Sequence, residues 1–167
     1  FPGLNLCWEV REGQQKHNLR YDQPGGKAFS TPNASLEAQV ANLSDEIAYY
    51  SHDLDDGLEA GLLDEEKLLA DVSIWRDTAK FVREQFGDLP DECRRFYTIR
   101  CIIDDQVRDV VTMSEAAIRR AAVKSADDAR RQPGRLIRYS AERRKLNGQL
   151  RKYLYRNFYY HPVVSKP

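Results

Sequence analysis

The sequence predicts an all-α protein, a helical bundle. Apolar residues recur at alternating steps of three and four, as they do on one face of an α-helix, and no segment alternates apolar and polar residues as a half-buried β-strand does. The chain has 167 residues, which is enough to bury a hydrophobic core within one unit. We therefore expect a single helical unit over residues 1–167.

Residues that favour helix starts and ends divide the chain into six expected helices. The first covers 4–17, and a loop rich in Gly, Pro and Asn follows at 18–34. Ser35 is suited to cap the second helix, which runs to about Gly61 and has Glu37 in its first turn. The remaining helices are expected over 64–72, over 73–86 up to Gly87, over 90–123 from Pro90, and from Ser140 to His161-Pro162, with a break at "RRQPGRL".

Charge is unevenly distributed although the chain holds 26 basic and 26 acidic residues. Residues 1–113 contain 12 Lys or Arg and 22 Asp or Glu, whereas residues 114–156 contain 13 and 4. Such a basic region can contact another copy of the chain, bind phosphates or nucleotides, or only face solvent. Its basic side chains are Arg119, Arg120, Lys124, Arg130, Arg131, Arg135, Arg138, Arg143, Arg144, Lys145, Arg151, Lys152 and Arg156, and the tyrosines among and after them, which can stack on bases, are Tyr139, Tyr153, Tyr155, Tyr159 and Tyr160.

Cysteine content and hydropathy predict a cytoplasmic protein. Cys7, Cys93 and Cys101 are odd in number, and no pair has the spacing of metal ligands, as is typical of a reduced intracellular chain. No run of about 18 apolar residues is present, so we expect no membrane partner. The first residues lack a basic leader and a cleavage site, and the missing initiator Met leads us to expect a piece of a longer protein.

The segment "NLSDEIAYYSHDLDDGLEAGLL", residues 42–63, lies in the second expected helix and has two contrasting faces. At about 100° per residue, five of its apolar side chains fall within roughly 60° of one another, namely those of Leu36, Leu43, Ile47, Leu54 and Leu58. Asp45, Tyr49 and Asp53 lie on the opposite side at i, i+4 and i+8, so they form a ladder along the helix. The apolar stripe comprises Leu36, Val40, Leu43, Ile47, Tyr50, Leu54 and Leu58, and the polar face also holds His52 and Asp56.

This polar face has two interpretations from its residues alone. It can be a solvated surface, as polar faces of amphipathic helices usually are. It can also be a binding face, because no Lys or Arg compensates its three aspartates and an aromatic ring lies between two of them. Two carboxylates around a ring suit a ligand with a metal at one end and a sugar in the middle.

The segment "LSDEIAYYSHDLDDGLEAGL" closely resembles the deoxynucleoside-triphosphate triphosphohydrolases, the dGTPase-like family of the HD superfamily. Two further blocks, "FPGLNLCWEVREG" with the following Lys-His pair and "RKLNGQLRKYLYRNFYYHPVV", look like segments of the same family. The resemblance implies that the chain is the C-terminal portion of an HD-domain fold. It also implies that residues 1–63 complete the active site and that residues 64–167 form a C-terminal helical region.

The resemblance implies a role for each member of the ladder. Asp45 matches the last of the family's metal ligands, Tyr49 would pack against the deoxyribose and disfavour a 2′-hydroxyl, and Asp53 would accept a hydrogen bond from the 3′-hydroxyl. The metal would be a divalent ion, Mn, Mg, Fe, Co, Ni or Zn. Glu46 stands where some relatives have a Lys that contacts phosphate, so that role is not transferred.

The chain lacks the family's other metal ligands, a His and a His-Asp doublet that lie N-terminal to the "GLNL" segment. The doublet His52-Asp53 lies within the ladder helix and does not replace them, and His17 and His161 are expected to be structural. The chain departs from the family again at Gln14-Gln15, where relatives have an apolar pair. We expect no catalytic residue in the chain, no tightly bound metal and no activity of the chain alone.

The implied reaction of the full-length enzyme is metal-dependent hydrolysis of dGTP or another dNTP to a deoxynucleoside and triphosphate. The resemblance also implies a homo-oligomer, with single-stranded DNA or a regulatory nucleotide as possible partners of the basic region. The alternative is a non-catalytic helical module that binds single-stranded nucleic acid or a partner through its basic C-terminal face.

Overall fold

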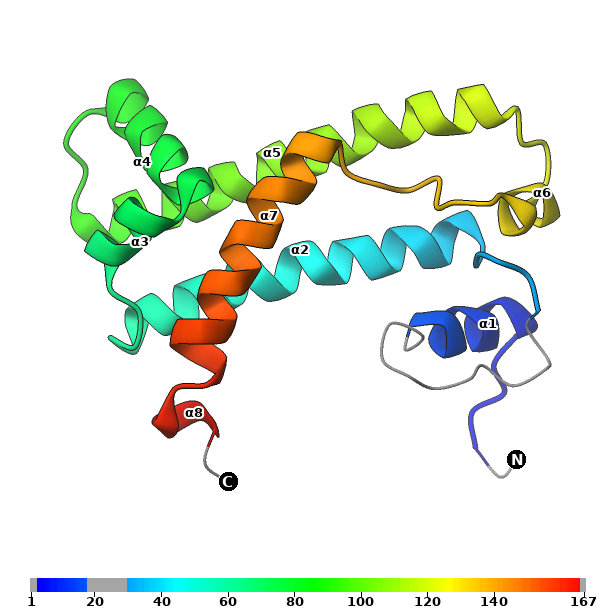
Figure 1. Ribbon diagram of the computed structural model, residues 1–167, viewed down its shortest axis with the longest axis horizontal. Helices are drawn as coiled ribbons and strands as arrows, with labels where there is room; N and C mark the ends of the chain where they lie inside the picture. The colour runs from blue at the N-terminus through cyan, green and yellow to red at the C-terminus, as the bar shows by residue number, and fades with distance from the viewer. Residues whose placement is uncertain (1–2, 18–29, 166–167) are drawn as a thin grey trace. The chain divides into compact units, whose positions relative to one another are not determined.

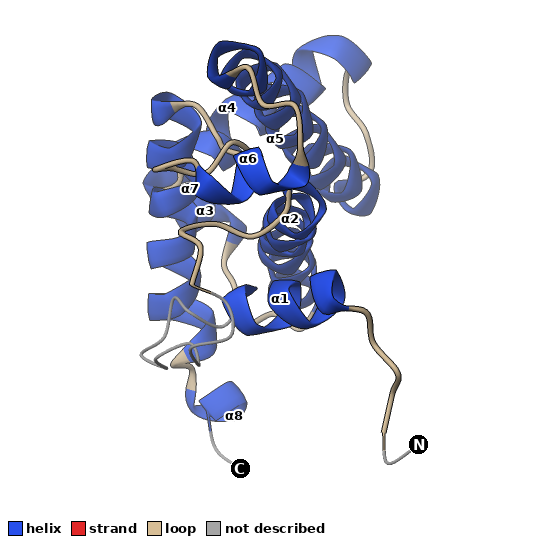
Figure 2. Cartoon of the chain, turned by 90° about the vertical axis from the view of Figure 1, so that its right-hand side faces the viewer, coloured by secondary structure: helices blue, strands red, loops and turns tan. Residues whose placement is uncertain are grey.

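The computed structural model of the chain confirms the all-α prediction (Figure 1). It describes residues 3–17 and 30–165, so most of the predicted loop at 18–34 lies outside the described residues. The described part consists of helices and loops only (Figure 2). Its elements are α1 (Trp8–His17), α2 (Leu36–Glu59), α3 (Glu65–Asp71), α4 (Ser73–Phe86), α5 (Asp91–Ala121), α6 (Ala126–Arg131), α7 (Ala141–Leu154), the π-helical turn η2 (Tyr155–Tyr159) and α8 (Pro162–Ser165).

The predicted helix ends are confirmed where a specific residue caps the helix. The Oγ atoms of Ser35 and Ser140 accept hydrogen bonds from the backbone N–H groups three residues further on, at 3.3 and 3.0 Å. Gly87 ends α4 with a φ of 71°, a backbone conformation that glycine adopts without strain. The sequence analysis did not predict α6, and it did not predict that the last helix passes into a π-helical turn.

The chain divides into two compact units. Unit 1 comprises residues 1–45 and 110–138, and unit 2 comprises residues 46–109 and 139–167. The helices α2 and α5 contribute residues to both units. The division at residue 63, between a part that completes the active site and a C-terminal helical region, concerns function and not compactness, and it stays a prediction.

The core of unit 1 combines small apolar side chains with buried polar groups. Ala117, Ala129 and Leu136 are nearly inaccessible to solvent and pack together. The Gln39 side chain is also buried, and its Oε1 accepts hydrogen bonds from the backbone N–H groups of Leu136 and Ile137 at 2.9 and 3.2 Å. This pairing satisfies backbone groups of an irregular segment that would otherwise be costly to bury.

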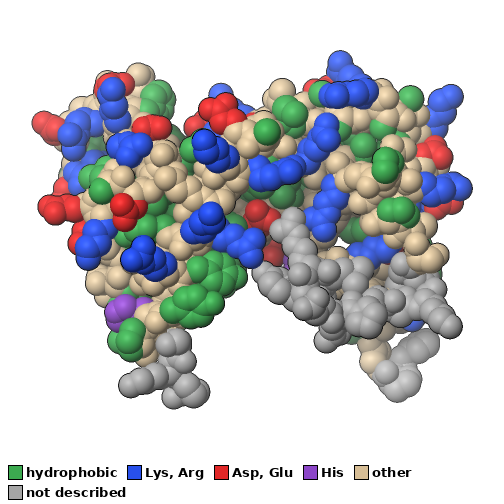
Figure 3. All heavy atoms as spheres, in the orientation of Figure 1, with side chains coloured by type: hydrophobic (Ala, Val, Ile, Leu, Met, Phe, Trp, Pro, Cys, Tyr) green, Lys and Arg blue, Asp and Glu red, His purple; other side chains and the backbone are tan. Residues whose placement is uncertain are grey.

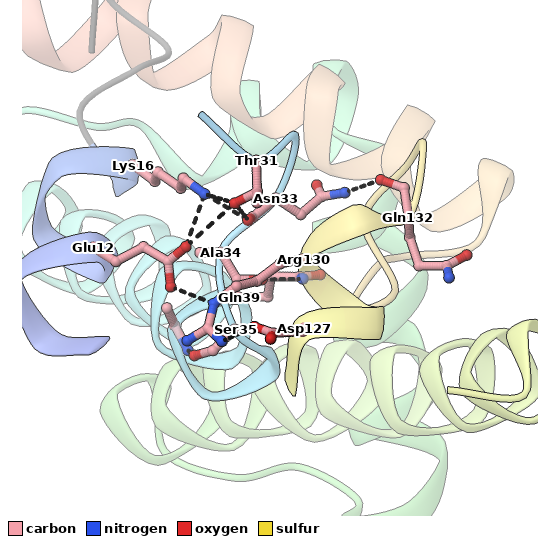
Figure 4. Close-up of polar contacts among 11 residues, drawn as sticks. Glu12, Lys16, Thr31, Asn33, Ala34, Ser35, Gln39, Asp127, Arg130 and Gln132 are labelled. Carbon is pink, nitrogen blue, oxygen red and sulfur yellow. Dashed lines mark hydrogen bonds and ion pairs between the residues drawn. The ribbon is translucent and has the colours of Figure 1, made fainter. Parts of the chain in front are cut away.

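A buried ion cluster joins α1 to α6 within unit 1 (Figure 4). The carboxylate of Glu12 is inaccessible to solvent and accepts hydrogen bonds from Lys16 Nζ at 2.9 Å and from Arg130 Nε at 2.8 Å. Lys16 also donates to Thr31 Oγ1 and to the carbonyl of Asn33, at 2.7 and 2.6 Å. The only buried side chains on α1 among the described residues are Glu12 and Lys16, so ionic rather than apolar contacts hold this helix.

Unit 2 has the larger apolar core. Its fully buried side chains come from α2, α3, α4, α5, α7 and the connections between them, and they include Leu54 of α2, Trp75 of α4 and Ile102 of α5. Along the predicted apolar stripe of α2, Ile47, Tyr50 and Leu54 of unit 2 are buried as expected, and so is Leu43 of unit 1. Val40 of unit 1 was also predicted to belong to this stripe, but it is 47% exposed because it lies at the margin of the helix face.

We predict that Ala122→Gly stabilises the protein. Ala122 follows the end of α5 with a φ of 50°, in the left-handed region that is unfavourable for a side chain with a Cβ atom. The left-handed conformation costs roughly 1–2 kcal/mol for a residue with a Cβ atom, a cost that glycine avoids. Urea unfolding of the 167-residue chain should show a higher midpoint, whereas Ala116→Gly, at an exposed position inside α5, should lower it. Equal destabilisation by both changes would contradict the prediction.

Within the described residues, no helix is both long enough and apolar enough to cross a membrane.

Candidate functional site

The polar ladder lies on α2, whose apolar face fixes the direction of the polar one. Within unit 2, burial of Ile47 and Leu54 turns Tyr49 and Asp53 away from the centre of the core. Asp45 belongs to unit 1 and is described with that unit.

In unit 1, Asp45 lines an open groove with a volume of about 670 Å³. The Asp45 side chain is 69% exposed, and its Oδ2 lies 3.8 Å from Nε2 of His17. The other ring nitrogen of His17 contacts the side-chain oxygen of Asn42. The structure therefore places His17, which we expected to be structural, directly beside the predicted metal ligand.

Asp45 fits one position of a divalent-metal site. A carboxylate oxygen is a ligand that Mg²⁺ and Mn²⁺ prefer, and this one is open to solvent. No group of three or more His, Cys, Asp or Glu side chains in the described part of the chain could hold a metal ion. Asp45 would therefore have to act together with ligands outside the described residues.

In unit 2, a third side chain joins the other two ladder residues. The hydroxyl of Tyr159, on η2, donates a hydrogen bond to Oδ2 of Asp53. The Tyr159 ring also stacks on Tyr49, with ring centroids 5.8 Å apart and an angle of 27° between the planes. Tyr49 is 51% exposed, so an aromatic surface and a carboxylate stand side by side at the surface of this unit.

The environment of Asp53 favours the protonated form more than water does. Burial raises the pKa of this carboxyl above its ordinary value, and the negative charge of Asp56 raises it further. The hydrogen bond from Tyr159 and the proximity of His52 act in the opposite direction but do not cancel the effect of burial. Burial and the bonded Asp53 carboxylate raise the pKa of the Tyr159 phenol as well, so Tyr159 remains a donor at neutral pH. Half-buried carboxylates with perturbed pKa values are found preferentially at functional sites.

The basic region is less accessible than the sequence suggested. Arg130 is buried in the ion cluster, and Tyr139 and Tyr153 are only 6% and 7% exposed, so these two tyrosines do not offer stacking surfaces. Figure 3 shows one face of the molecule with its Lys and Arg side chains in blue. Within the part of the basic region that belongs to unit 2, the exposed basic residues lie on α7 and η2, and they are Arg144, Lys145, Lys152 and Arg156.

Sequence reasoning missed Tyr159 as a member of the site. Tyr159 and Asp53 are 106 positions apart, and no local pattern connects them. The one available signal was that Tyr159 falls within the third of the family-like blocks, "RKLNGQLRKYLYRNFYYHPVV".

The relatives found by comparison with known proteins share one description. The chain is 38% identical over 170 residues to a deoxyguanosinetriphosphate triphosphohydrolase-like protein of Geobacter sulfurreducens. It is 40% identical over 171 residues to one of Bordetella pertussis and 36% identical over 171 residues to one of Nitrosomonas europaea. No model of a protein family matches the chain.

Each of these alignments covers 99% of the chain, and the chain spans 44% to 45% of the length of these relatives. A C-terminal portion of such a protein would give this coverage. The resemblance seen in the sequence is thus confirmed, and the chain is homologous, over nearly its whole length, to part of the deoxyguanosinetriphosphate triphosphohydrolase-like proteins.

Proposed function

We propose that the full-length protein, of which this chain would be the C-terminal part, hydrolyses deoxynucleoside triphosphates to a deoxynucleoside and triphosphate in a metal-dependent reaction. One observation in the structure supports the proposal in addition to the similarity to these relatives. Tyr49 and Asp53, which match the family's sugar contacts, are adjacent on the surface of unit 2 and share a contact with Tyr159.

Each ladder residue would have a distinct task. The exposed ring of Tyr49 would pack against the deoxyribose and leave no room for a 2′-hydroxyl. The Asp53 carboxylate would accept a hydrogen bond from the 3′-hydroxyl and orient the sugar. Asp45 would bind the divalent ion, whose positive charge stabilises negative charge on phosphoryl oxygens and lowers the pKa of bound water.

The reaction would add the oxygen of water to the α-phosphorus and break the bond between this phosphorus and the 5′-oxygen. The deoxynucleoside leaves with the 5′-oxygen, and the three phosphates remain joined. The 167-residue chain should not catalyse this reaction by itself, because it would supply only one of the family's four metal ligands. Turnover of a dNTP by the isolated chain would contradict that expectation.

Discrimination between dGTP and GTP tests this proposal. With Mn²⁺ and the full-length protein, kcat/KM should be at least about 10-fold higher for dGTP, since a 2′-hydroxyl has to fit against Tyr49. Tyr49→Ala should reduce this preference, whereas Tyr97→Ala, a change to an exposed tyrosine of α5, should leave it intact. Equal hydrolysis of both nucleotides would refute the assigned role of Tyr49, and hydrolysis of none of the four dNTPs, with or without a second dNTP as activator, would refute the proposed function.

The exposed basic residues of α7 and η2 support a second candidate function. Arg144, Lys145, Lys152 and Arg156 project within about 120° on a helical wheel, and Arg151 lies 5.4 Å from the ring of Tyr155. Such a surface suits single-stranded nucleic acid, a regulatory nucleotide or a second copy of the chain. Nucleic-acid affinity should then fall steeply between 50 and 200 mM salt, as is general for phosphate contacts. A flat salt response would exclude nucleic acid.

A further inference from the structure

Tyr159 contacts both of the residues assigned to the sugar. Its hydroxyl donates to Asp53 Oδ2, and its ring stacks on Tyr49. The two contacts differ in kind, because one fixes a carboxylate and the other fixes the plane of an aromatic ring. A side chain that makes both at once sets the position of the acceptor relative to the stacking surface.

The π-helical turn explains how Tyr159 reaches this position. In η2 the backbone N–H of Tyr160 bonds to the carbonyl of Tyr155 at 3.3 Å, five residues back, so one extra residue is accommodated in the turn. Such turns are rare and frequently lie at functional sites. Here the turn directs the hydroxyl of Tyr159 to Asp53 of α2, while the side chains of Phe158 and Tyr159 both pack against the core.

Neighbouring aromatic rings restrict the movement of Tyr159. The ring of Tyr155 meets it edge-on at 4.9 Å and 74°, and the ring of Phe158 lies 5.6 Å away. Aromatic pairs at these separations and angles are favourable beyond the area that they bury. The Tyr159 phenol is therefore held in place rather than free to adapt to Asp53.

A carboxylate can accept several hydrogen bonds, and Tyr159 engages only Oδ2 of Asp53. Among residues 3–17 and 30–165, no donor is seen on the other oxygen, Oδ1, which can accept a hydrogen bond from a ligand. A donor on Oδ2 also favours the charged carboxylate, which opposes the effect of burial on Asp53. An ionised and oriented carboxylate is the stronger acceptor for a hydroxyl group.

We infer that Tyr159 is a positioning residue of the deoxyribose site, which holds the Asp53 carboxylate and the Tyr49 ring in the arrangement that receives the 3′-hydroxyl. This inference rests on the proposed function and adds a residue to it. Tyr159 acts through Asp53, so its effect should depend on a 3′-hydroxyl in the ligand.

Tyr159→Phe tests the inference because it removes only the hydroxyl and keeps the ring that packs. In the full-length protein with Mn²⁺, the KM for dGTP should rise about 5- to 10-fold, the size of one ordinary hydrogen bond, because the Asp53 carboxylate is no longer held in place for the 3′-hydroxyl, while kcat changes less than twofold. The KM for 2′,3′-dideoxy-GTP, which lacks the 3′-hydroxyl, should not change. In an Asp53→Asn background, Tyr159→Phe should have no further effect on the KM for dGTP.

Tyr160→Phe is the matched control, because Tyr160 is adjacent and 72% exposed. Its KM values should equal those of the wild type. Equal increases of KM for dGTP and the dideoxy nucleotide on Tyr159→Phe would show a merely structural role and overturn the inference. A lower KM for dGTP would also overturn it, because Tyr159 would then compete with the sugar for Asp53.

A binding measurement separates this inference from the proposed function. Without metal, NMR titration of the full-length protein should show weaker binding of deoxyguanosine to the Tyr159→Phe variant, and unchanged binding of 2′,3′-dideoxyguanosine. If the wild type binds none of the four deoxynucleosides and hydrolyses none of the four dNTPs, the proposed function fails. If the wild type does both and the variant matches it, only the role of Tyr159 fails.

Discussion

Replacing Asp45 with alanine should abolish dNTP turnover by the full-length protein without unfolding it. Loss of an outer-shell partner of a metal typically costs 10- to 100-fold in metal affinity or activity, so loss of a ligand should lower kcat by more than about 100-fold. The side chain is 69% exposed, so its removal should change the free energy of unfolding by no more than about 0.5 kcal/mol.

The matched control is Asp56→Ala, which removes another exposed aspartate from the polar face of α2. This variant should retain most of the activity. The experiment also separates the two candidate functions, because a module that binds through its basic face should not need Asp45. Asp45→Ala with the turnover of the wild type would refute the metal-ligand assignment.

The largest effect on stability is expected for Glu12→Ala. This change leaves Lys16 and Arg130, which are 6% and 7% exposed, without the carboxylate that both of them contact. Breaking a buried ion pair by removal of one partner costs about 3–5 kcal/mol. We expect a loss of about 3 kcal/mol, because Lys16 keeps its hydrogen bonds to Thr31 and the Asn33 carbonyl, and Arg130 keeps its contact with Asp127 at 2.9 Å.

Urea unfolding of the 167-residue chain measures this loss, with Glu9→Ala as the control on the exposed side of α1. The control should change the free energy of unfolding by about 0.5 kcal/mol or less. Similar losses in the two variants would mean that the ion cluster does not hold α1 in place.

The same cluster predicts how stability depends on pH. Burial alone would raise the pKa of Glu12, but the hydrogen bonds and charges of Lys16 and Arg130 outweigh it, so the pKa is lower than in the unfolded chain. The resulting stabilisation is present above the ordinary glutamate pKa of about 4.3 and is lost as the pH falls through the lowered value. Glu12→Ala should therefore reduce the loss of stability in acid.

Local patterns in the sequence predicted the helices because capping residues and apolar periodicity act over a few positions. Ser35, Gly87 and Ser140 mark helix ends by contacts with their immediate neighbours. The six-residue helix α6 was missed because it has too few residues to show periodicity.

Local sequence patterns could not predict the contacts that define the site and the ion cluster. Arg130 reaches Glu12 across 118 positions, and Tyr159 reaches Asp53 across 106. The sequence places Arg130 in a basic region, but only the fold shows that it is buried against a carboxylate. The π-helical turn that presents Tyr159 likewise depends on packing against α2, since the local residues would also allow a regular helix.

The identity of the phosphate product tests the central claim most directly. The full-length protein would be incubated with dGTP and Mn²⁺, and the products would be separated by ion chromatography. We predict intact triphosphate and deoxyguanosine in equal amounts. Absence of triphosphate with each of the four dNTPs, in the presence or absence of a second dNTP as activator, would contradict the account and leave the basic face as the functional surface.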